Sequence, residues 1–230
     1  MLKTLILIAM WFAIPIAVNA QSKPSDVKTK EPAPKAEKKV NPRPAVQPPK
    51  TVTVEPFEKA TVEMMAAQCV KFETEAGIIE MEMYPESAPE SVRGFLNLAA
   101  TEALDTTTFS RVVPGFVIQG GDLFTRTEMT AEFDKRAWRT LPDEPSQIKH
   151  ERGILSMARS DEPNSASTHF FILLSEARTL DGKFAAFGRV TKGMETVEAI
   201  NKMPVEGEKP TKPVRIMRAS VAPCQVTPKL

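Results

Sequence analysis

The chain has 230 residues, of which 42% are hydrophobic and 26% are charged, and its formal net charge at pH 7 is +1. This length allows one large domain or two small ones, and the balanced charge argues against nucleic acid as the main partner. The balance conceals an asymmetry, because residues 21–50 carry 8 Lys/Arg against 3 Asp/Glu, whereas residues 51–230 carry 21 against 26.

The first 20 residues have the layout of a secretory signal peptide. Lys3 precedes an apolar run from Leu5 to Val18, and the small residues Val18 and Ala20 suit cleavage after Ala20. A permanent membrane anchor is the alternative, but the apolar run is shorter than the roughly 20 residues that a spanning helix needs. We therefore expect an exported protein, either periplasmic or secreted.

Residues 21–60 are predicted to form a linker ahead of a domain that covers residues 61–230. Residues 21–50 contain seven prolines and eight basic residues without apolar periodicity. Such a composition cannot bury enough apolar surface to offset the entropy lost on ordering. A plain spacer is the favoured interpretation, and weak contact of the basic side chains with the cell envelope is the alternative.

Cys69 and Cys224 are the only cysteines, and they stand near the two ends of the predicted domain. In an oxidising compartment their pairing would tie the first strand to the last, whereas two buried free thiols are the alternative. With two cysteines and two histidines in an unfamiliar spacing, a zinc site is not expected. The sequence predicts neither a metal nor a cofactor.

The domain is predicted to contain many short strands and two helices. Alternating apolar and polar residues indicate a hairpin, and apolar residues at helical spacing follow Pro89 and recur over residues 194–203. Residues 125–150 read as a charged excursion with some helix, with Trp138 as its large anchor. Strands are predicted over residues 70–74, 78–84, 109–122, 154–158, 169–174, 184–190 and 214–222. Because strands and helices do not alternate, these elements favour an antiparallel sheet closed into a barrel or a sandwich.

Several motifs in a fixed order resemble those of the cyclophilin family of peptidyl-prolyl isomerases. The stretch FSRVVPGFVIQGGD at residues 109–122 is followed by GILSMAR, THFFI, LDGK, FGRV and GMETVEAI. The similarity covers about residues 68–225, and the loop SDEPNSAST looks more like bacterial members. It implies a mainly β fold, namely a closed eight-stranded antiparallel β-barrel capped by two α-helices, with the proline site on the outer surface of the barrel.

The resemblance implies catalysis by Arg111, oriented by Gln119. An Xaa-Pro amide isomerises slowly because rotation breaks its resonance, with a barrier of roughly 18–20 kcal/mol. In the twisted transition state the prolyl nitrogen gains a lone pair, so a guanidinium aimed at it stabilises the twisted amide more than the planar one. Arginine suits this role because it stays charged and presents a rigid fork of donors.

The resemblance also implies a set of substrate-binding residues. The walls of the proline pocket match Phe116, Phe171 and Leu180, and Ala158 matches a position that contacts the residue before proline. At three further substrate-site positions the chain departs from the residues common in the family, and these are Val117, His169 and Phe184.

The surroundings of the pocket differ from the family pattern as well. Ser110 stands where a histidine is frequent, and residues 125–139 replace a glycine-rich loop. Thr179 replaces a tryptophan that family members use to bind cyclosporin, which implies weak inhibition by that drug.

The sequence therefore predicts an exported prolyl cis–trans isomerase, with Arg111 stabilising the twisted prolyl amide and with proline-containing polypeptides as clients. The expected state is a monomer. A second hypothesis remains open at this point, a catalytically weak cyclophilin-like module that binds proline-containing segments of a partner protein. The altered positions around the pocket are what support that alternative.

Overall fold

The structure is a computed structural model that describes residues 55–224. The predicted signal peptide (residues 1–20) and most of the predicted linker (residues 21–60) lie outside the described residues. The helices and strands follow one another as α1 (Val62–Ala66), β1 (Gln68–Thr74), β2 (Gly77–Met83), α2 (Pro89–Ala100), β3 (Arg111–Val113), β4 (Val117–Gly120), η1 (Leu123–Thr125), α3 (Ala131–Trp138), β5 (Ile154–Met157), β6 (Phe170–Leu173), η2 (Arg178–Leu180), β7 (Ala186–Lys192), α4 (Met194–Asn201), β8 (Val205–Glu206), β9 (Lys209–Pro210) and β10 (Ile216–Pro223).

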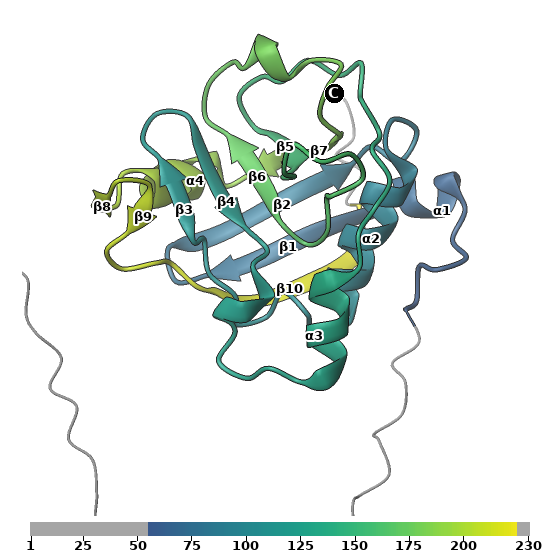
Figure 1. The fold of residues 1–230 in the computed structure, drawn as a ribbon, viewed down its shortest axis with the longest axis horizontal. Helices are drawn as coiled ribbons and strands as arrows, with labels where there is room; N and C mark the ends of the chain where they lie inside the picture. The colour runs from purple at the N-terminus through teal and green to yellow at the C-terminus, as the bar shows by residue number, and fades with distance from the viewer. Residues whose placement is uncertain (1–54, 225–230) are drawn as a thin grey trace, which may run out of the picture. The chain divides into compact units, whose positions relative to one another are not determined.

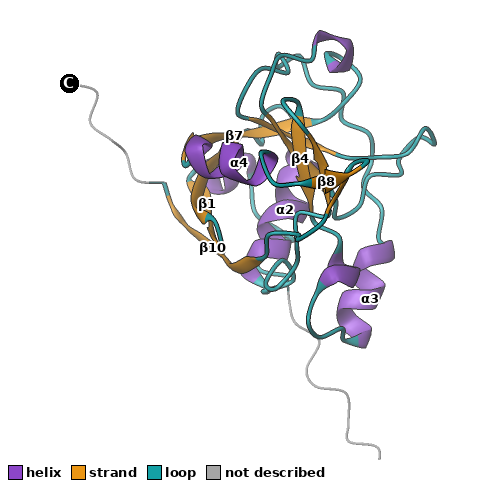
Figure 2. Cartoon of the chain, turned by 90° about the vertical axis from the view of Figure 1, so that its left-hand side faces the viewer, coloured by secondary structure: helices purple, strands orange, loops and turns teal. Residues whose placement is uncertain are grey.

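Eight strands form one curled antiparallel sheet in the order β10-β1-β2-β7-β5-β6-β4-β3 (Figure 1). Helix α2 contacts β10 and β7, and α4 contacts β2, β3 and β4. The two predicted helices are therefore present, and the described chain adds the five-residue α1 and the eight-residue α3, the latter labelled in Figure 2. The mainly β architecture with eight antiparallel strands is as predicted.

The predicted closure of the barrel is not confirmed, because no ladder joins the edge strands β3 and β10 in the described part of the chain. The segment just before β3 meets the start of β10 through isolated contacts: the Thr106 N–H donates to the Ile216 carbonyl and the Ile216 N–H donates to the Thr107 carbonyl, each at 2.8 Å. Thr108 and Arg215 form an isolated bridge, and the Phe109 N–H donates to the Val214 carbonyl at 2.9 Å. The sheet is accordingly an open, curled one.

Phenylalanine rings fill the interior between the sheet and α2. Phe95 on α2 lies 5.0 Å from Phe187 and 5.2 Å from Phe170, measured between ring centroids, and Phe72 lies 5.7 Å from Phe170. All four side chains are buried. Burying such large apolar side chains is the main stabilising contribution to this fold.

The predicted strand over residues 109–122 is a hairpin instead. Its two strands, β3 and β4, are separated by a turn that contains Pro114 and Gly115. Proline cannot donate to a strand ladder, and Gly115 has a φ of +73°, which side chains with a Cβ rarely adopt. The chain therefore reverses at this point, and Arg111 and Gln119 lie on neighbouring strands.

The excursion over residues 125–150 contains α3, but Trp138 is not its anchor. The Trp138 side chain is 71% exposed and contacts the Phe124 ring at 5.9 Å between centroids. Within α3 the buried side chain is that of Arg136, whose Nη2 donates to the Gly94 carbonyl and whose Nε lies 3.2 Å from a Glu55 carboxylate oxygen. A hydrogen bond to the backbone of α2 and an ion pair to Glu55, which accepts from Asn97 of α2, hold Arg136 in place, so the sequence-based expectation was wrong here.

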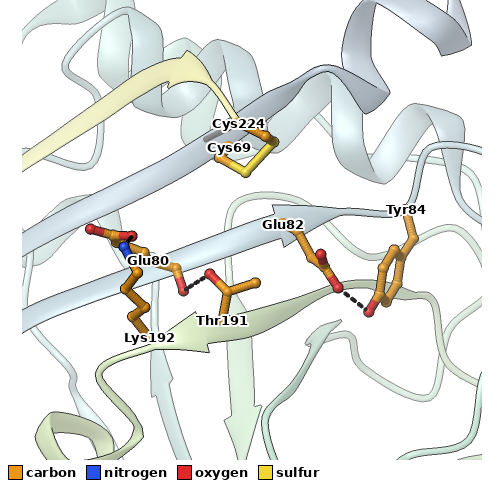
Figure 3. Close-up of a disulfide and its surroundings, with 7 residues drawn as sticks. All are labelled: Cys69, Glu80, Glu82, Tyr84, Thr191, Lys192 and Cys224. Carbon is orange, nitrogen blue, oxygen red and sulfur yellow. Dashed lines mark hydrogen bonds and ion pairs between the residues drawn. A yellow bond between two sulfur atoms is a disulfide. The ribbon is translucent and has the colours of Figure 1, made fainter. Parts of the chain in front are cut away.

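Cys69 and Cys224 form a disulfide across the edge of the sheet (Figure 3). Cys69 lies in β1, and Cys224 directly follows the last residue of β10. Between residues 55 and 224 no helix is both long enough and apolar enough to cross a membrane.

Candidate active site

The strand register brings three of the predicted site residues into one row. Arg111 on β3 pairs with Gln119 on β4, and Gln119 pairs with Phe171 on β6. Residues opposite one another in neighbouring strands project from the same face of a sheet. This row therefore lies on one face, and Phe170 and Ile172 point to the other face, into the interior.

Asn201, at the end of α4, holds the β3–β4 hairpin in place. Its Oδ1 accepts from the Gly115 N–H at 2.7 Å, and its Nδ2 donates to the carbonyls of Val113 at 2.9 Å and Val117 at 3.0 Å. Asn201 and Val117 are both buried, so the bond to the Val117 carbonyl satisfies a polar group of the interior, and the other two bonds hold the more exposed turn. The helix thereby fixes the turn that presents the site.

A cavity of about 220 Å³ opens on this face, and its lining is mostly apolar. It collects eight of the nine predicted active-site residues and one that was not predicted, Arg159. The lining residues are Arg111, Phe116, Val117, Gln119, Ala158, Arg159, Phe171, Leu180 and Phe184.

The Arg111 guanidinium is held at two of its edges. Its Nε donates to Glu208 Oε2 at 2.6 Å, and its Nη1 donates to Gln119 Oε1 at 3.3 Å. The hydrogen bond from Arg111 and the positive charge of its guanidinium lower the pKa of Glu208. The cation thus stands beside an apolar cavity with its orientation set from both sides.

The aromatic side of the cavity is built by two phenylalanines. Phe171 and Phe184 meet edge to face, with ring centroids 6.2 Å apart. The Arg159 guanidinium carbon lies 5.0 Å from the centroid of the Phe184 ring, within the range of a cation–π contact. Such rings offer a proline side chain a flat apolar surface.

A second, polar cavity of about 190 Å³ contains the remaining predicted residue, His169. Gln119, Ala158 and Arg159 line both cavities, so the two share a border. The other lining residues of the polar cavity are Ser160, Ser165 and Ser167.

Two positions at which the sequence differs from the family pattern do not line either the apolar or the polar cavity. Thr179 is an exposed residue of η2 next to Leu180, and Ser110 directly precedes β3. The other histidine, His150, is fully buried and lies 3.1 Å from Asp181 through Nδ1 and 3.1 Å from Ser156 through Nε2. Burial lowers the pKa of His150, and its contacts make it part of the protein interior.

Sequence reasoning missed three residues that build the site, namely Arg159, Asn201 and Glu208. Arg159 was visible as the last residue of the GILSMAR motif. Neither Asn201 nor Glu208 carries a local signal, because each acts on a strand more than 80 residues away. Over residues 55–224 no group of three or more His, Cys, Asp or Glu side chains is placed to hold a metal ion.

The chain matches the family model described as cyclophilin type peptidyl-prolyl cis-trans isomerase/CLD over residues 69–221. A peptidyl-prolyl cis-trans isomerase of Arabidopsis thaliana is 40% identical over 141 residues, which is 60% of this chain and 62% of the relative. One from Dictyostelium discoideum is 36% identical over 68% of this chain and 99% of the relative. One from Acinetobacter baylyi is 33% identical over 68% of this chain and 87% of the relative.

A solved structure of a Cryptosporidium parvum cyclophilin type peptidyl-prolyl cis-trans isomerase, determined in the presence of the dipeptide Ala-Pro, is similar with a TM-score of 0.59 and 29% identity. The similarity covers 67% of this chain and 98% of that one. The family match, these relatives and the shared fold agree with the geometry of the site. The chain therefore belongs to the cyclophilin family and is a peptidyl-prolyl cis–trans isomerase.

Proposed function

We propose that Arg111 catalyses the isomerisation by stabilising the twisted prolyl amide, and that the apolar cavity holds the proline ring. The observation that carries this proposal is the guanidinium fixed by Gln119 at the edge of a cavity lined by Phe116, Phe171 and Leu180. The ring is held while the preceding carbonyl swings, and the guanidinium donates toward the nitrogen as its lone pair develops. No nucleophile or proton shuttle enters this scheme.

The polar cavity next to the proline pocket receives the residues that precede the proline. Ala158 lies on the border of the two cavities, which supports its assignment to the residue before proline. His169 and the three serine side chains offer hydrogen-bonding groups further along the polar cavity. Val117 and Phe184 belong to the proline pocket itself.

The clients in this proposal are exported proteins that contain Xaa-Pro bonds. Its support is the layout of residues 1–20, which lie outside the described residues, together with the disulfide between Cys69 and Cys224. The enzyme is proposed to act as a bacterial, periplasmic or secreted monomer, with the basic linker in weak contact with the envelope. Fractionation of cells, with N-terminal sequencing of the mature chain, tests this part, and a mature N-terminus at Gln21 is expected.

The catalytic role is tested by NMR exchange between the cis and trans peaks of an Ala-Xaa-Pro-Phe peptide. Arg111→Ala should lower the catalysed exchange rate by about 100-fold, the usual loss when one preorganised donor is removed. Arg218→Ala, an exposed residue of β10 outside both cavities, is the matched control and should leave the rate unchanged. Binding of the peptide without acceleration by the unaltered enzyme would favour the binding-module hypothesis instead.

A further inference from the structure

Glu208 lies at the tip of a small hairpin that no motif of the sequence marks. Strands β8 and β9 pair Glu206 with Lys209, which leaves Gly207 and Glu208 as the two central residues of the turn. Gly207 has a φ of +65°, and glycine with positive φ at the first central position is typical of a type II′ hairpin turn. The turn therefore has a defined geometry.

The backbone of this hairpin is attached to β3 right beside the catalytic arginine. The Val112 N–H donates to the Glu208 carbonyl at 2.8 Å, and Val112 is the neighbour of Arg111 in the chain. At the base of the hairpin the Thr211 N–H donates to the Pro204 carbonyl at 2.9 Å, and Pro210 is buried. These backbone hydrogen bonds fix the position of the hairpin, and with it the position of the Glu208 carboxylate beside Arg111.

Two of the guanidinium nitrogens of Arg111 are hydrogen-bonded to side chains of the described chain, and the third is not. Glu208 takes the Nε edge at 2.6 Å and Gln119 takes Nη1 at 3.3 Å. Among residues 55–224 Nη2 makes no hydrogen bond, so it remains available to a substrate. A guanidinium is planar, and two anchors at different edges restrict both its position and its plane.

We propose that Glu208 is a positioning residue for catalysis, which holds Arg111 in the orientation that the twisted prolyl amide requires. The inference rests on the proposed role of Arg111. Correct placement of a catalytic group lowers the barrier strongly, and a displacement of about 1 Å can cost up to about 100-fold in rate. Glu208 does not line the cavity, so it acts through the arginine and does not contact the substrate.

The negative charge of Glu208 could in principle weaken the field of the guanidinium at the substrate. Its side chain is 55% exposed, and solvent screens charges at such positions. Exposed ion pairs also contribute little to folding stability, so variants at this position are expected to fold. The effect of Glu208 on orientation therefore outweighs its effect on the local charge.

The test compares Glu208→Ala, Glu208→Gln and Glu206→Ala in the peptide exchange assay, with rates measured over a range of peptide concentrations. Glu206 is the matched control, because it is an exposed glutamate of the same hairpin whose side chain makes no hydrogen bond or ion pair with any described residue. We expect Glu208→Ala to lower kcat about tenfold with KM changed less than twofold. Glu208→Gln should recover most of kcat, since an amide oxygen still accepts from Nε, and Glu206→Ala should match the unaltered enzyme.

A second measurement separates this inference from the proposed function. In an Arg111→Ala background, Glu208→Ala should cause no further loss, because there is no guanidinium left to position. If Arg111→Ala keeps full activity, the proposed role of Arg111 fails. If Arg111→Ala is inactive but Glu208→Ala is as fast as Glu206→Ala, or faster, only the role of Glu208 is overturned.

Discussion

At the scale of single residues, the ion pair between Arg111 and Glu208 ties the cation proposed to act in catalysis to an exposed carboxylate. The two groups lie 97 positions apart in the chain and meet at 2.6 Å. Because the carboxylate is exposed, its titration can be followed directly in solution. The pair therefore offers a measurement of the site that does not depend on activity.

Removing the guanidinium should raise the pKa of Glu208. The hydrogen bond and the charge of Arg111 lower this pKa, so Arg111→Ala should return it toward the ordinary glutamate value of about 4.3. An NMR titration of the side-chain carboxyl carbon measures the change, with Arg218→Ala as the control that leaves the pKa in place. Identical titration of Glu208 with and without Arg111 would show that the pair does not form in solution.

At the scale of elements, successive side chains of β6 point alternately into the interior and toward the candidate active site. Phe170 packs against Phe72 and Phe95 in the interior, whereas Phe171 lines the cavity. Both side chains are buried, so burial alone does not distinguish their roles. Adjacent residues of one strand are therefore expected to respond differently to the same substitution.

Phe170→Ala should lower the free energy of unfolding by about 3–5 kcal/mol, because it leaves a cavity among packed rings. Phe171→Ala should cost less stability, since its side chain already borders an open cavity, and should weaken peptide binding and activity. Urea unfolding gives the stabilities and the peptide exchange assay gives the activities. Equal losses of stability, with activity intact in Phe171→Ala, would contradict this division of roles.

The junction between α4 and the β3–β4 hairpin depends on one amide side chain. Asn201→Ala removes three hydrogen bonds, one of them to the carbonyl of the buried Val117, so the free energy of unfolding should fall by about 1–3 kcal/mol. Activity should fall as well, because the hairpin carries Arg111 and Gln119. Lys202→Ala, at the exposed next position, should leave both quantities unchanged in the same urea and exchange measurements. Full activity of a folded Asn201→Ala enzyme would show that the hairpin holds its shape without the amide.

At the scale of the whole molecule, the disulfide closes a loop of 155 residues that contains the entire sheet and the site. Cys69→Ser/Cys224→Ser should lower the free energy of unfolding by about 5 kcal/mol in the chain-entropy model. The double variant should keep its activity, because neither cysteine lines a cavity. Urea unfolding with and without reductant checks this, and the unaltered protein in reductant should behave like the variant. Equal stability of oxidised and reduced protein would refute it.

Local patterns were enough for the parts of the fold that depend on neighbouring residues. Alternation predicted the β1–β2 hairpin, and the ordered motifs implied the eight antiparallel strands. The motifs also pointed to Arg111 and Gln119, which the β3–β4 register brings to one face, and to Phe116, which lines the same cavity from the turn between these strands. The hairpin follows from short-range periodicity, whereas the strand number and the site residues follow from the resemblance to the cyclophilin family that the motifs carry.

The features that the sequence did not predict depend on contacts between residues far apart in the chain, and no local sequence pattern indicates such contacts. Glu208 reaches Arg111 because a distant hairpin docks on β3, and the described ends of the sheet meet through isolated backbone contacts without a ladder. The prediction for Trp138 was wrong for a similar reason. Large aromatic residues are usually buried, but here Trp138 is exposed and Arg136 of the same helix is buried. Such features depend on which surfaces meet after the chain has folded.

The exposed Trp138 has a practical consequence for spectroscopy. The chain has two tryptophans, and cleavage after Ala20 would remove Trp11, leaving Trp138 as the single indole fluorophore of the mature protein. The residue is 71% exposed in the folded state, so its emission should already resemble that of an indole in water and should shift little on denaturation. Circular dichroism is therefore the better signal for unfolding. Thr179→Trp, beside Leu180 at the cavity, would create a fluorescent reporter of peptide binding.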